Sequence, residues 1–177
     1  MTKLKGILLT EGMHGMISQV EGLAKALDIN YSHHTVETKG FWKVIPPKFT
    51  PISDSVFKKI ECEDVDLIIS CGRKSIIPSL FLKKNSKKKV FNIHIQNPKI
   101  KLDNFDLVVV PEHDNLDGHN VLKTKGAIHY LTSEEIEKDK EYLFSISSKL
   151  KDKNIISLII GGPCLLYTSP SPRDLRK

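Results

Sequence analysis

The sequence has few of the residues that would build a disulfide framework, a metal centre or a membrane span. Its three cysteines, Cys62, Cys71 and Cys164, form no CxxC pair and have no ligand-like spacing, so neither disulfides nor bound zinc are expected. No run approaches the ~20 apolar residues that a membrane span needs. The apolar stretch near the N-terminus is too short for a signal peptide. These absences favour a soluble, cytoplasmic protein without a bound metal.

Arginine is also scarce. The formal net charge is +6, but only three of the 27 basic residues are arginine. The densest basic cluster holds lysines alone: Lys83, Lys84, Lys87, Lys88 and Lys89. Arginine forks and interleaved aromatic rings, which read nucleic-acid bases, are missing from it. We therefore interpret the cluster as a solvated turn, with contact to anionic lipid or phosphate as the alternative, and expect no nucleic-acid partner.

What the sequence does contain is an alternation of short apolar strands and amphipathic helices. The pattern predicts strands over 4–10, 31–37, 65–71, 90–95, 107–110, 121–124 and 155–160, and helices over 16–27, 52–60, 75–84 and 134–150. The last helix has a capping signature, with Thr132 or Ser133 as the cap and Glu135 in the first turn. Apolar strands that alternate with helices predict an α/β fold, a Rossmann-like doubly wound parallel sheet.

In such a sheet ligands bind outside the carboxyl ends of the strands, so the residues after each strand are the candidates. Gly12 and Gly15 frame a turn before a helix, whose free N–H groups can bind an anion; a plain tight turn is the alternative. This spacing is not the full dinucleotide fingerprint, so no NAD or other cofactor is expected. Gly72 and Arg73 stand at the start of a second helix. Arg73 there indicates either a bound anion or a simple exposed cation, and the sequence leaves both interpretations open.

The ends of the fourth and fifth predicted strands carry an amide and a histidine. Gln96 and Asn97, an amide pair before a proline, suit hydrogen bonding to a sugar or base, and also suit an ordinary turn. His113 lies between Glu112 and Asp114, and flanking carboxylates orient an imidazole and favour its charged form. We take these three as candidate catalytic residues, with His113 as the general acid–base; a structural turn is the alternative.

Together these segments resemble a known family in order and spacing. The resemblance is carried by TEGMHGMISQVEGLAKAL (10–27), ISCGRKS (69–75), VFNIHIQNPK (90–99), FDLVVVPEHD (105–114), NVLKTKGAIH (120–129) and LIIGGP (158–163). These stretches resemble the mitochondrial-fission "elongated mitochondria" family of plants and alphaproteobacteria, over residues 4–163. A composition rich in Lys, Ile and Asn favours a bacterial source.

The resemblance implies the N-terminal half of a two-domain, GT-B-like protein of the glycosyltransferase type. In that architecture the N-terminal domain meets the acceptor and the C-terminal domain holds the nucleotide-sugar donor. A sugar or phosphate-containing ligand would lie at the strand ends. Its expected contacts are Gly12, Gly15, Gln19, Gly72, Arg73, Gln96, Asn120, Gly161 and Gly162. Bacterial members labelled as nucleotide-sugar epimerases are a poor guide, because this sequence has no Tyr-x-x-x-Lys pair.

The expected organisation is a Rossmann-like domain over 1–150, the start of a truncated second domain over 151–163, and a non-native or disordered tail over 164–177. The tail has no helix or strand period and is rich in Ser and Pro. Such a fragment is expected to be inactive. The alternative function is a non-catalytic adaptor that binds a protein partner or a membrane surface through the Phe41-Trp42 loop and the lysine cluster, since plant members are linked to recruiting a dynamin-like GTPase.

Overall fold

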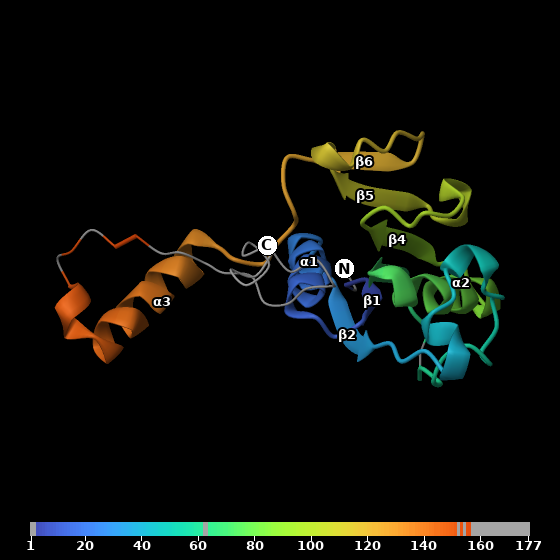
Figure 1. The fold of residues 1–177 in the computed structure, drawn as a ribbon, viewed down its shortest axis with the longest axis horizontal. Coiled ribbons are helices and arrows are strands. Elements are labelled where there is room, and N and C mark those ends of the chain that lie inside the picture. The colour runs from blue at the N-terminus through green and yellow to red at the C-terminus, as the bar shows by residue number, and fades with distance from the viewer. Residues whose placement is uncertain (1–2, 62–63, 152, 154, 157–177) are drawn as a thin grey trace, which may run out of the picture. The chain divides into compact units, whose positions relative to one another are not determined.

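Six strands form one parallel sheet in the computed structural model, which describes residues 3–61, 64–151, 153 and 155–156 (Figure 1). The strands are β1 (Lys5–Thr10), β2 (Asn30–Thr35), β3 (Leu67–Cys71), β4 (Phe91–Ile95), β5 (Leu107–Pro111) and β6 (Val121–Thr124). They lie in the order β2-β1-β3-β4-β5-β6, and each neighbouring pair is parallel. The prediction of a Rossmann-like α/β fold is confirmed.

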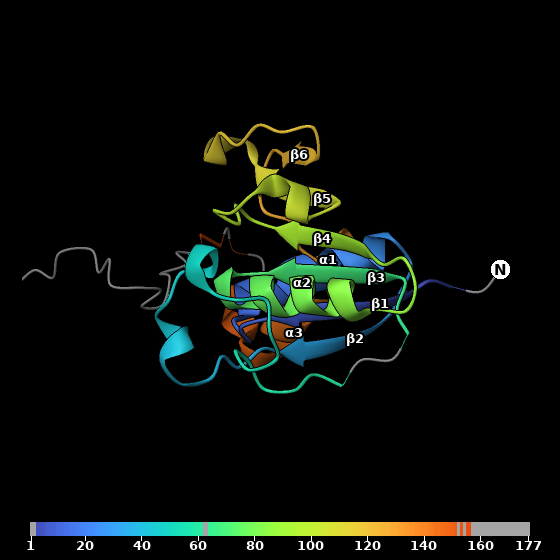
Figure 2. The ribbon, with the colours of Figure 1, turned by 90° about the vertical axis from the view of Figure 1, so that its right-hand side faces the viewer.

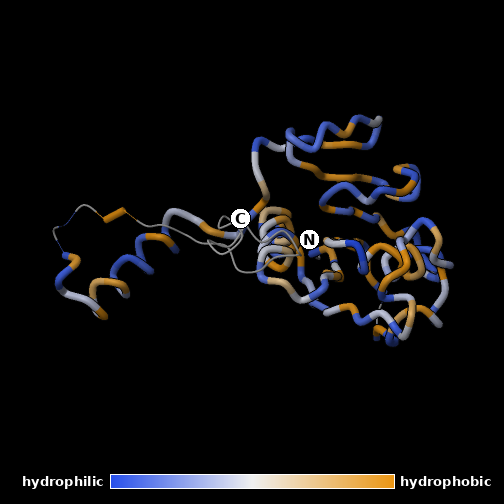
Figure 3. The backbone as a smooth tube through the Cα atoms, viewed as in Figure 1, coloured by the Kyte–Doolittle hydropathy of each residue, from blue (hydrophilic) through white to orange (hydrophobic). Residues whose placement is uncertain are grey.

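Two helices cover opposite faces of the sheet: α1 (His14–Ala26) and α2 (Ile76–Asn85) (Figure 2). On one face Leu8 and Ile69 pack with Val20 of α1, and on the other Ile68 packs with Ile77 of α2. Parallel strands covered on both faces are apolar almost throughout, and the hydropathy colouring shows β5 as a nearly continuous hydrophobic run (Figure 3). Side chains from successive strand positions therefore build two separate cores.

After β6 the chain returns across α1. A Cβ atom on Gly22 would lie 2.6 Å from both the carbonyl carbon and oxygen of His129, so no larger residue fits between the helix and the returning backbone. Ile128 adds to the α1-side core, and the ammonium of Lys25 lies 4.7 Å from the ring centroid of Tyr130. The close approach at Gly22 thus anchors the end of the first part of the chain.

The helix predicted over 52–60 is wrong. Residues 52–56 form bends and turns, and the chain pairs at Phe57: Thr38 and Phe57 form an antiparallel bridge, and the Lys39 N–H donates to the Val56 carbonyl at 2.7 Å. The pairing satisfies backbone groups and buries Val56 and Phe57 together in the α2-side core. Tertiary contacts here override a helical spacing of apolar residues. Single 3-10 turns lie at Gly40–Lys43, Pro47–Phe49, Arg73–Ser75, Leu102–Asn104, Glu112–Asp114 and Ser148–Leu150.

The chain divides into two compact units, Met1–Leu131 and Thr132–Lys177. The second contains α3 (Ser133–Ile146), which begins with the predicted capping box. Thr132 Oγ1 accepts the Glu135 N–H at 3.2 Å, and the Glu135 carboxylate accepts the Thr132 N–H at 3.0 Å. The predicted strand over 155–160 lies mainly outside the described residues, and the predicted boundaries at 150 and 163 stay predictions.

Candidate functional site

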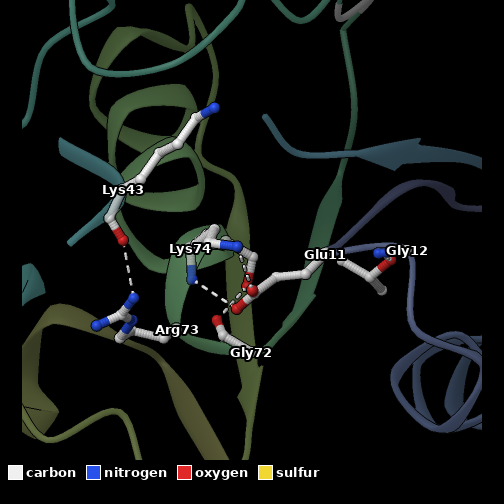
Figure 4. A network of polar contacts seen from close by, with 8 residues as sticks. Glu11, Gly12, Lys43, Gly72, Arg73 and Lys74 are labelled. Carbon is white, nitrogen blue, oxygen red and sulfur yellow. Dashed lines mark hydrogen bonds and ion pairs between the residues drawn. The ribbon is translucent and has the colours of Figure 1, made fainter. Parts of the chain in front are cut away.

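The strand order reverses between β1 and β3, the position where sheets of this kind usually bind ligands. Here that position is filled by Glu11, whose side chain is only 15% exposed. One carboxylate oxygen accepts the Lys74 N–H at 3.0 Å and the other lies 3.0 Å from the Lys74 ammonium (Figure 4). Glu11 therefore supplies the anion that the sequence led us to expect at the start of this helix.

The glycines around Glu11 are required by the backbone and by packing. Gly12 and Gly72 have φ angles of +84° and +94°, which disfavour any other residue. A Cβ on Gly72 would also lie 2.8 Å from the Met16 sulfur. Gly15 differs, because nothing lies within 4 Å of a Cβ built on it. Of the predicted ligand glycines Gly12, Gly15 and Gly72, the first and the last thus have a structural reason to be glycine.

Arg73 faces away from this network. Its Nη2 donates to the Lys43 carbonyl at 2.9 Å and so ties the segment between β2 and β3 to the start of α2 (Figure 4). The structure does not bring the Arg73 side chain to the groove described next.

A polar groove of about 440 Å³ lies where three neighbouring strands end. It is lined by Gln19, Gln96, Asn97, Lys99, Pro111, His113, Asp114 and Ala127. These residues come from α1 and from the segments that follow β4, β5 and β6. The groove brings together four predicted site residues, Gln19, Gln96, His113 and Asp114. Asn97, the second residue of the predicted amide pair, also lines the groove, whereas Lys99 was not among the predicted site residues.

The backbone at the β4 end is held in an unusual conformation. Gln96 has a φ of +87° and Lys99 one of +53°, in a region that residues other than glycine rarely occupy. The Gln96 N–H continues the sheet by donating to the Val109 carbonyl at 2.8 Å, and Asn97 Oδ1 accepts the Lys99 N–H at 2.9 Å. Strain of this kind costs about 1–3 kcal/mol and gathers at functional sites. The strained β4–β5 connection is therefore a candidate for ligand binding.

His113 lies on the 3-10 turn after β5 with its side chain 76% exposed. Its Nε2 is 3.8 Å from an Asp114 carboxylate oxygen, beyond hydrogen-bond distance. Glu112 is exposed and does not line the groove. Within the described residues, His113 makes no hydrogen bond. Its imidazole is thus available to a ligand, and its predicted orientation by two carboxylates reduces to a loose contact with one.

Asn120 lies at the other edge of the sheet, just before β6. It is buried, and its amide nitrogen donates to the carbonyls of Leu102 and Phe105 at 2.9 and 2.8 Å. The structure therefore does not bring Asn120 to the groove but gives it a role in joining two loops. Gly161 and Gly162, the other predicted contacts of the later chain, lie outside the described residues.

Two buried titratable groups belong to the core beneath these strands. His94 Nδ1 lies 2.9 Å from Ser70 Oγ, its ring stacks on Phe105, and burial lowers the pKa of His94 to about 3. Burial, and then the Glu11 carboxylate, raise the pKa of the Cys71 thiol to about 12. Both side chains are therefore uncharged at neutral pH, and neither suits proton transfer there.

Metal ligands do not gather in the part of the chain that the structure describes, where no three His, Cys, Asp or Glu side chains form such a group. Among the same residues, no helix combines the length and apolar character that crossing a membrane requires.

Comparison with known proteins agrees with the resemblance read from the motifs. The model of the family described as Mitochondrial fission ELM1 matches residues 14–172. The Mitochondrial fission protein ELM1 of Arabidopsis thaliana is 35% identical over 48 residues, a region that is 27% of this chain and 11% of that relative. The chain thus aligns with only a small part of that relative's length. No solved structure matches the chain. Because the family model covers most of the sequence, the chain belongs to the Mitochondrial fission ELM1 family.

Proposed function

We propose that residues 1–131 are the acceptor-binding domain of a GT-B-like, glycosyltransferase-type protein, and that the polar groove binds a sugar or phosphate-containing ligand. The observation that carries the proposal is the groove itself, where polar side chains from consecutive strand ends surround a strained Gln96. Its volume of about 440 Å³ lies within the ~300–1,000 Å³ of small-molecule sites.

The side chains in the groove suit a ligand rich in hydroxyl groups. Gln19, Gln96 and Asn97 each offer an amide that can both donate and accept, Asp114 offers an acceptor, and Lys99 offers a cation for a phosphate. A sugar hydroxyl is at once a donor and an acceptor, so this mixture satisfies it better than an apolar or a purely cationic site would.

In this proposal His113 is the general base on an acceptor hydroxyl, and Asp114 stabilises the imidazolium that forms. The loose 3.8 Å contact between them would tighten when a ligand excludes water, as catalytic contacts often do. The donor would be held outside residues 1–131, so this domain is expected to bind the acceptor without transferring a sugar by itself. Robust sugar transfer by residues 1–131 alone would contradict that assignment.

Binding is tested by titrating the ¹⁵N-labelled chain with glucose 1-phosphate and with UDP-glucose. We expect amide shifts to concentrate at residues 96–99 and 111–114. His113→Ala should weaken binding about two- to tenfold, the loss of one hydrogen bond. His119→Ala is the matched control, because His119 is also 77% exposed and 4.0 Å from a carboxylate, that of Asp103, yet lies outside the groove. Equal effects of the two variants, or shifts away from the groove, would refute the proposal.

Catalysis is tested in a full-length member of the family. Replacing the histidine at the position of His113 with alanine should abolish most sugar transfer or sugar-nucleotide hydrolysis while leaving the protein folded. Unchanged turnover would remove His113 from the mechanism, even if the groove binds sugar.

A second candidate function, a non-catalytic adaptor, is favoured by one surface. Phe41, Val44 and Phe49 are all exposed on the segment between β2 and β3, and apolar side chains that gather into one exposed patch mark an interaction site. The lysine cluster supports this function less, because Lys83 and Lys88 pair with Asp106 and Asp66 at 2.7 and 2.8 Å.

Flotation with vesicles containing phosphatidylserine separates the membrane form of the adaptor from the enzyme. Membrane binding through the lysine cluster predicts that charge reversal at Lys87 and Lys89 releases the protein. Absence of flotation by the unmodified chain would eliminate the membrane form and leave a protein partner.

A further inference from the structure

A second and larger cavity, of about 640 Å³, lies on the α2 side of the sheet. Its walls are the segment around 47–52, the first turns of α2, and the connection between β4 and β5. In both ribbon views the segment between β2 and β3 lies beside α2 (Figures 1 and 2). The cavity is distinct from the polar groove, although the two share Lys99.

The floor of this cavity is apolar and its rim is positively charged. Ile52, Ile77, Leu80 and Ile100 provide the hydrocarbon surface, and the lysines at positions 48, 99 and 101 provide the charge. Among the described residues, no acidic side chain lines the cavity. In the part of the chain that the structure describes, these three lysines have no carboxylate within ion-pair distance, unlike those at 83 and 88 on the opposite edge. The cavity therefore lacks an internal counter-charge.

An apolar floor beneath unneutralised cations complements a molecule with a hydrocarbon part and an anionic group. Ile77 and Leu80 are buried residues, so a ligand must enter the cavity to touch them. The surface of an intact bilayer cannot contact Ile77 and Leu80 unless one lipid inserts its acyl chain into the cavity. This favours a single amphiphile over an intact membrane as the ligand. Transfer of each methylene from water into such a floor tightens binding about fourfold.

Lys99 lines both the apolar cavity and the polar groove, so an anionic group of a ligand that binds to it would lie at the boundary between them. Its backbone is fixed in the left-handed region, and the Asn97 side chain accepts its N–H. The ammonium can thus meet a phosphate that carries an apolar chain on one side and a polar head on the other. We infer that the ligand of this domain is a single-chain anionic amphiphile, such as an alkyl or prenyl phosphate, with its chain in the apolar cavity and its phosphate at Lys99. Only the placement of a sugar head in the polar groove rests on the proposed function.

The test is a calorimetric titration of the complete 177-residue chain with octyl, decyl and dodecyl phosphate below their micelle concentrations. We expect one site per chain and an affinity that rises about fourfold per methylene until the cavity is full. Inorganic phosphate should bind at least about tenfold more weakly than decyl phosphate, because it gains nothing from the floor. An affinity that does not depend on chain length, or the absence of saturable binding, would overturn the inference.

Variants locate the site and separate it from the polar groove. Lys101→Glu should weaken decyl phosphate about tenfold or more, while Lys87→Glu, at the opposite edge, should leave it unchanged. Ile52→Asp, at an exposed part of the cavity wall, should weaken it without disturbing the core. If the unmodified chain binds decyl phosphate but not glucose 1-phosphate, the proposed function of the polar groove fails while this inference stands. Equal losses in Lys101→Glu and Lys87→Glu would overturn the inference and indicate general charge attraction. Preferential binding to phosphatidylserine vesicles over monomeric decyl phosphate would also overturn it.

Discussion

The buried histidine of β4 should make the stability of residues 1–131 depend on pH. His94 is 1% exposed, and burial lowers its pKa from the ordinary 6.5 to about 3. In the unfolded chain the ring regains its ordinary pKa, so the unfolded chain binds a proton that the folded chain refuses. Falling pH therefore favours unfolding. The stability associated with neutral His94 is complete above the unfolded pKa, and it is lost progressively as the pH falls from 6.5 toward 3.

The magnitude follows from the two pKa values. Between pH 7.5 and pH 5.0 proton binding to the unfolded chain raises the equilibrium constant for unfolding by a factor of about 30 while folded His94 stays neutral, which lowers the free energy of unfolding by about 2 kcal/mol. The limiting slope is about 1.4 kcal/mol per pH unit. A small domain has about 5–15 kcal/mol of stability in total, so a change of this size is readily measured.

The assay is urea unfolding at the two pH values, followed by the fluorescence of Trp42. This is the single tryptophan of the chain, and it packs against the α2-side core of the first unit. His94→Gln removes the titrating ring and should remove about 2 kcal/mol of the pH dependence, whatever the variant's stability at pH 7.5. His119→Gln changes an exposed ring and should keep the full dependence. If His94→Gln and the unmodified chain lose the same stability between the two pH values, the assignment to His94 is wrong.

Three further predictions concern packing and reactivity. Gly22→Ala should lower stability by about 1–3 kcal/mol, because the added methyl meets the returning backbone, whereas Gly15→Ala should be neutral or stabilising by up to ~1 kcal/mol; similar urea midpoints for the two would contradict the close approach. Glu11→Gln should cost about 1–2 kcal/mol through loss of the charged acceptor for Lys74, and the unmodified chain should lose part of this difference in 1 M salt; a variant as stable as the parent in low salt would show that the ion pair contributes nothing. Cys71 should resist iodoacetamide at pH 8 in the folded chain and react in urea, as peptide mass spectrometry would show; rapid labelling without urea would mean that its thiol is not buried.

The alternation of strands and helices was predictable because parallel strands covered on both faces are apolar almost throughout. The strand at 107–110 and the helix at 75–84 illustrate this, since buried apolar runs leave few alternative structures. The failure at 52–60 has the opposite cause. Its apolar residues fit a helical face, but Val56 and Phe57 are buried through pairing with residues 37–39. That pairing joins segments separated by a long loop, and local spacing carries no information about it.

The residues of the candidate site could be predicted where their position directly after a strand is enough to identify them. Gln96 and His113 follow buried strands, and the carboxyl edge of a parallel sheet brings such residues together. The role of Glu11 was not predictable without the strand order, because only the pairing of β1 with β3 sets it beside Lys74. Asn120 was misplaced for a similar reason: it precedes a strand, so it lies at the amino edge, away from the groove.

The distribution of charge and strain along the carboxyl edge explains why binding is expected at β4–β6 rather than at the usual β1–β3 position. At β1–β3 a partly buried ion pair closes the edge, and a ligand would first have to separate Glu11 from Lys74, leaving a half-buried charge without its partner. At β4–β6 the conformational strain is already present in the folded chain, because Gln96 and Lys99 are held in left-handed conformations before any ligand binds. Among the described residues, the side chains of Gln96, Lys99 and Lys101 also have no hydrogen-bond or ion-pair partner. Because a ligand that meets preorganised, unneutralised groups gains binding free energy without displacing existing contacts, we expect a ligand to bind at the β4–β5 connection.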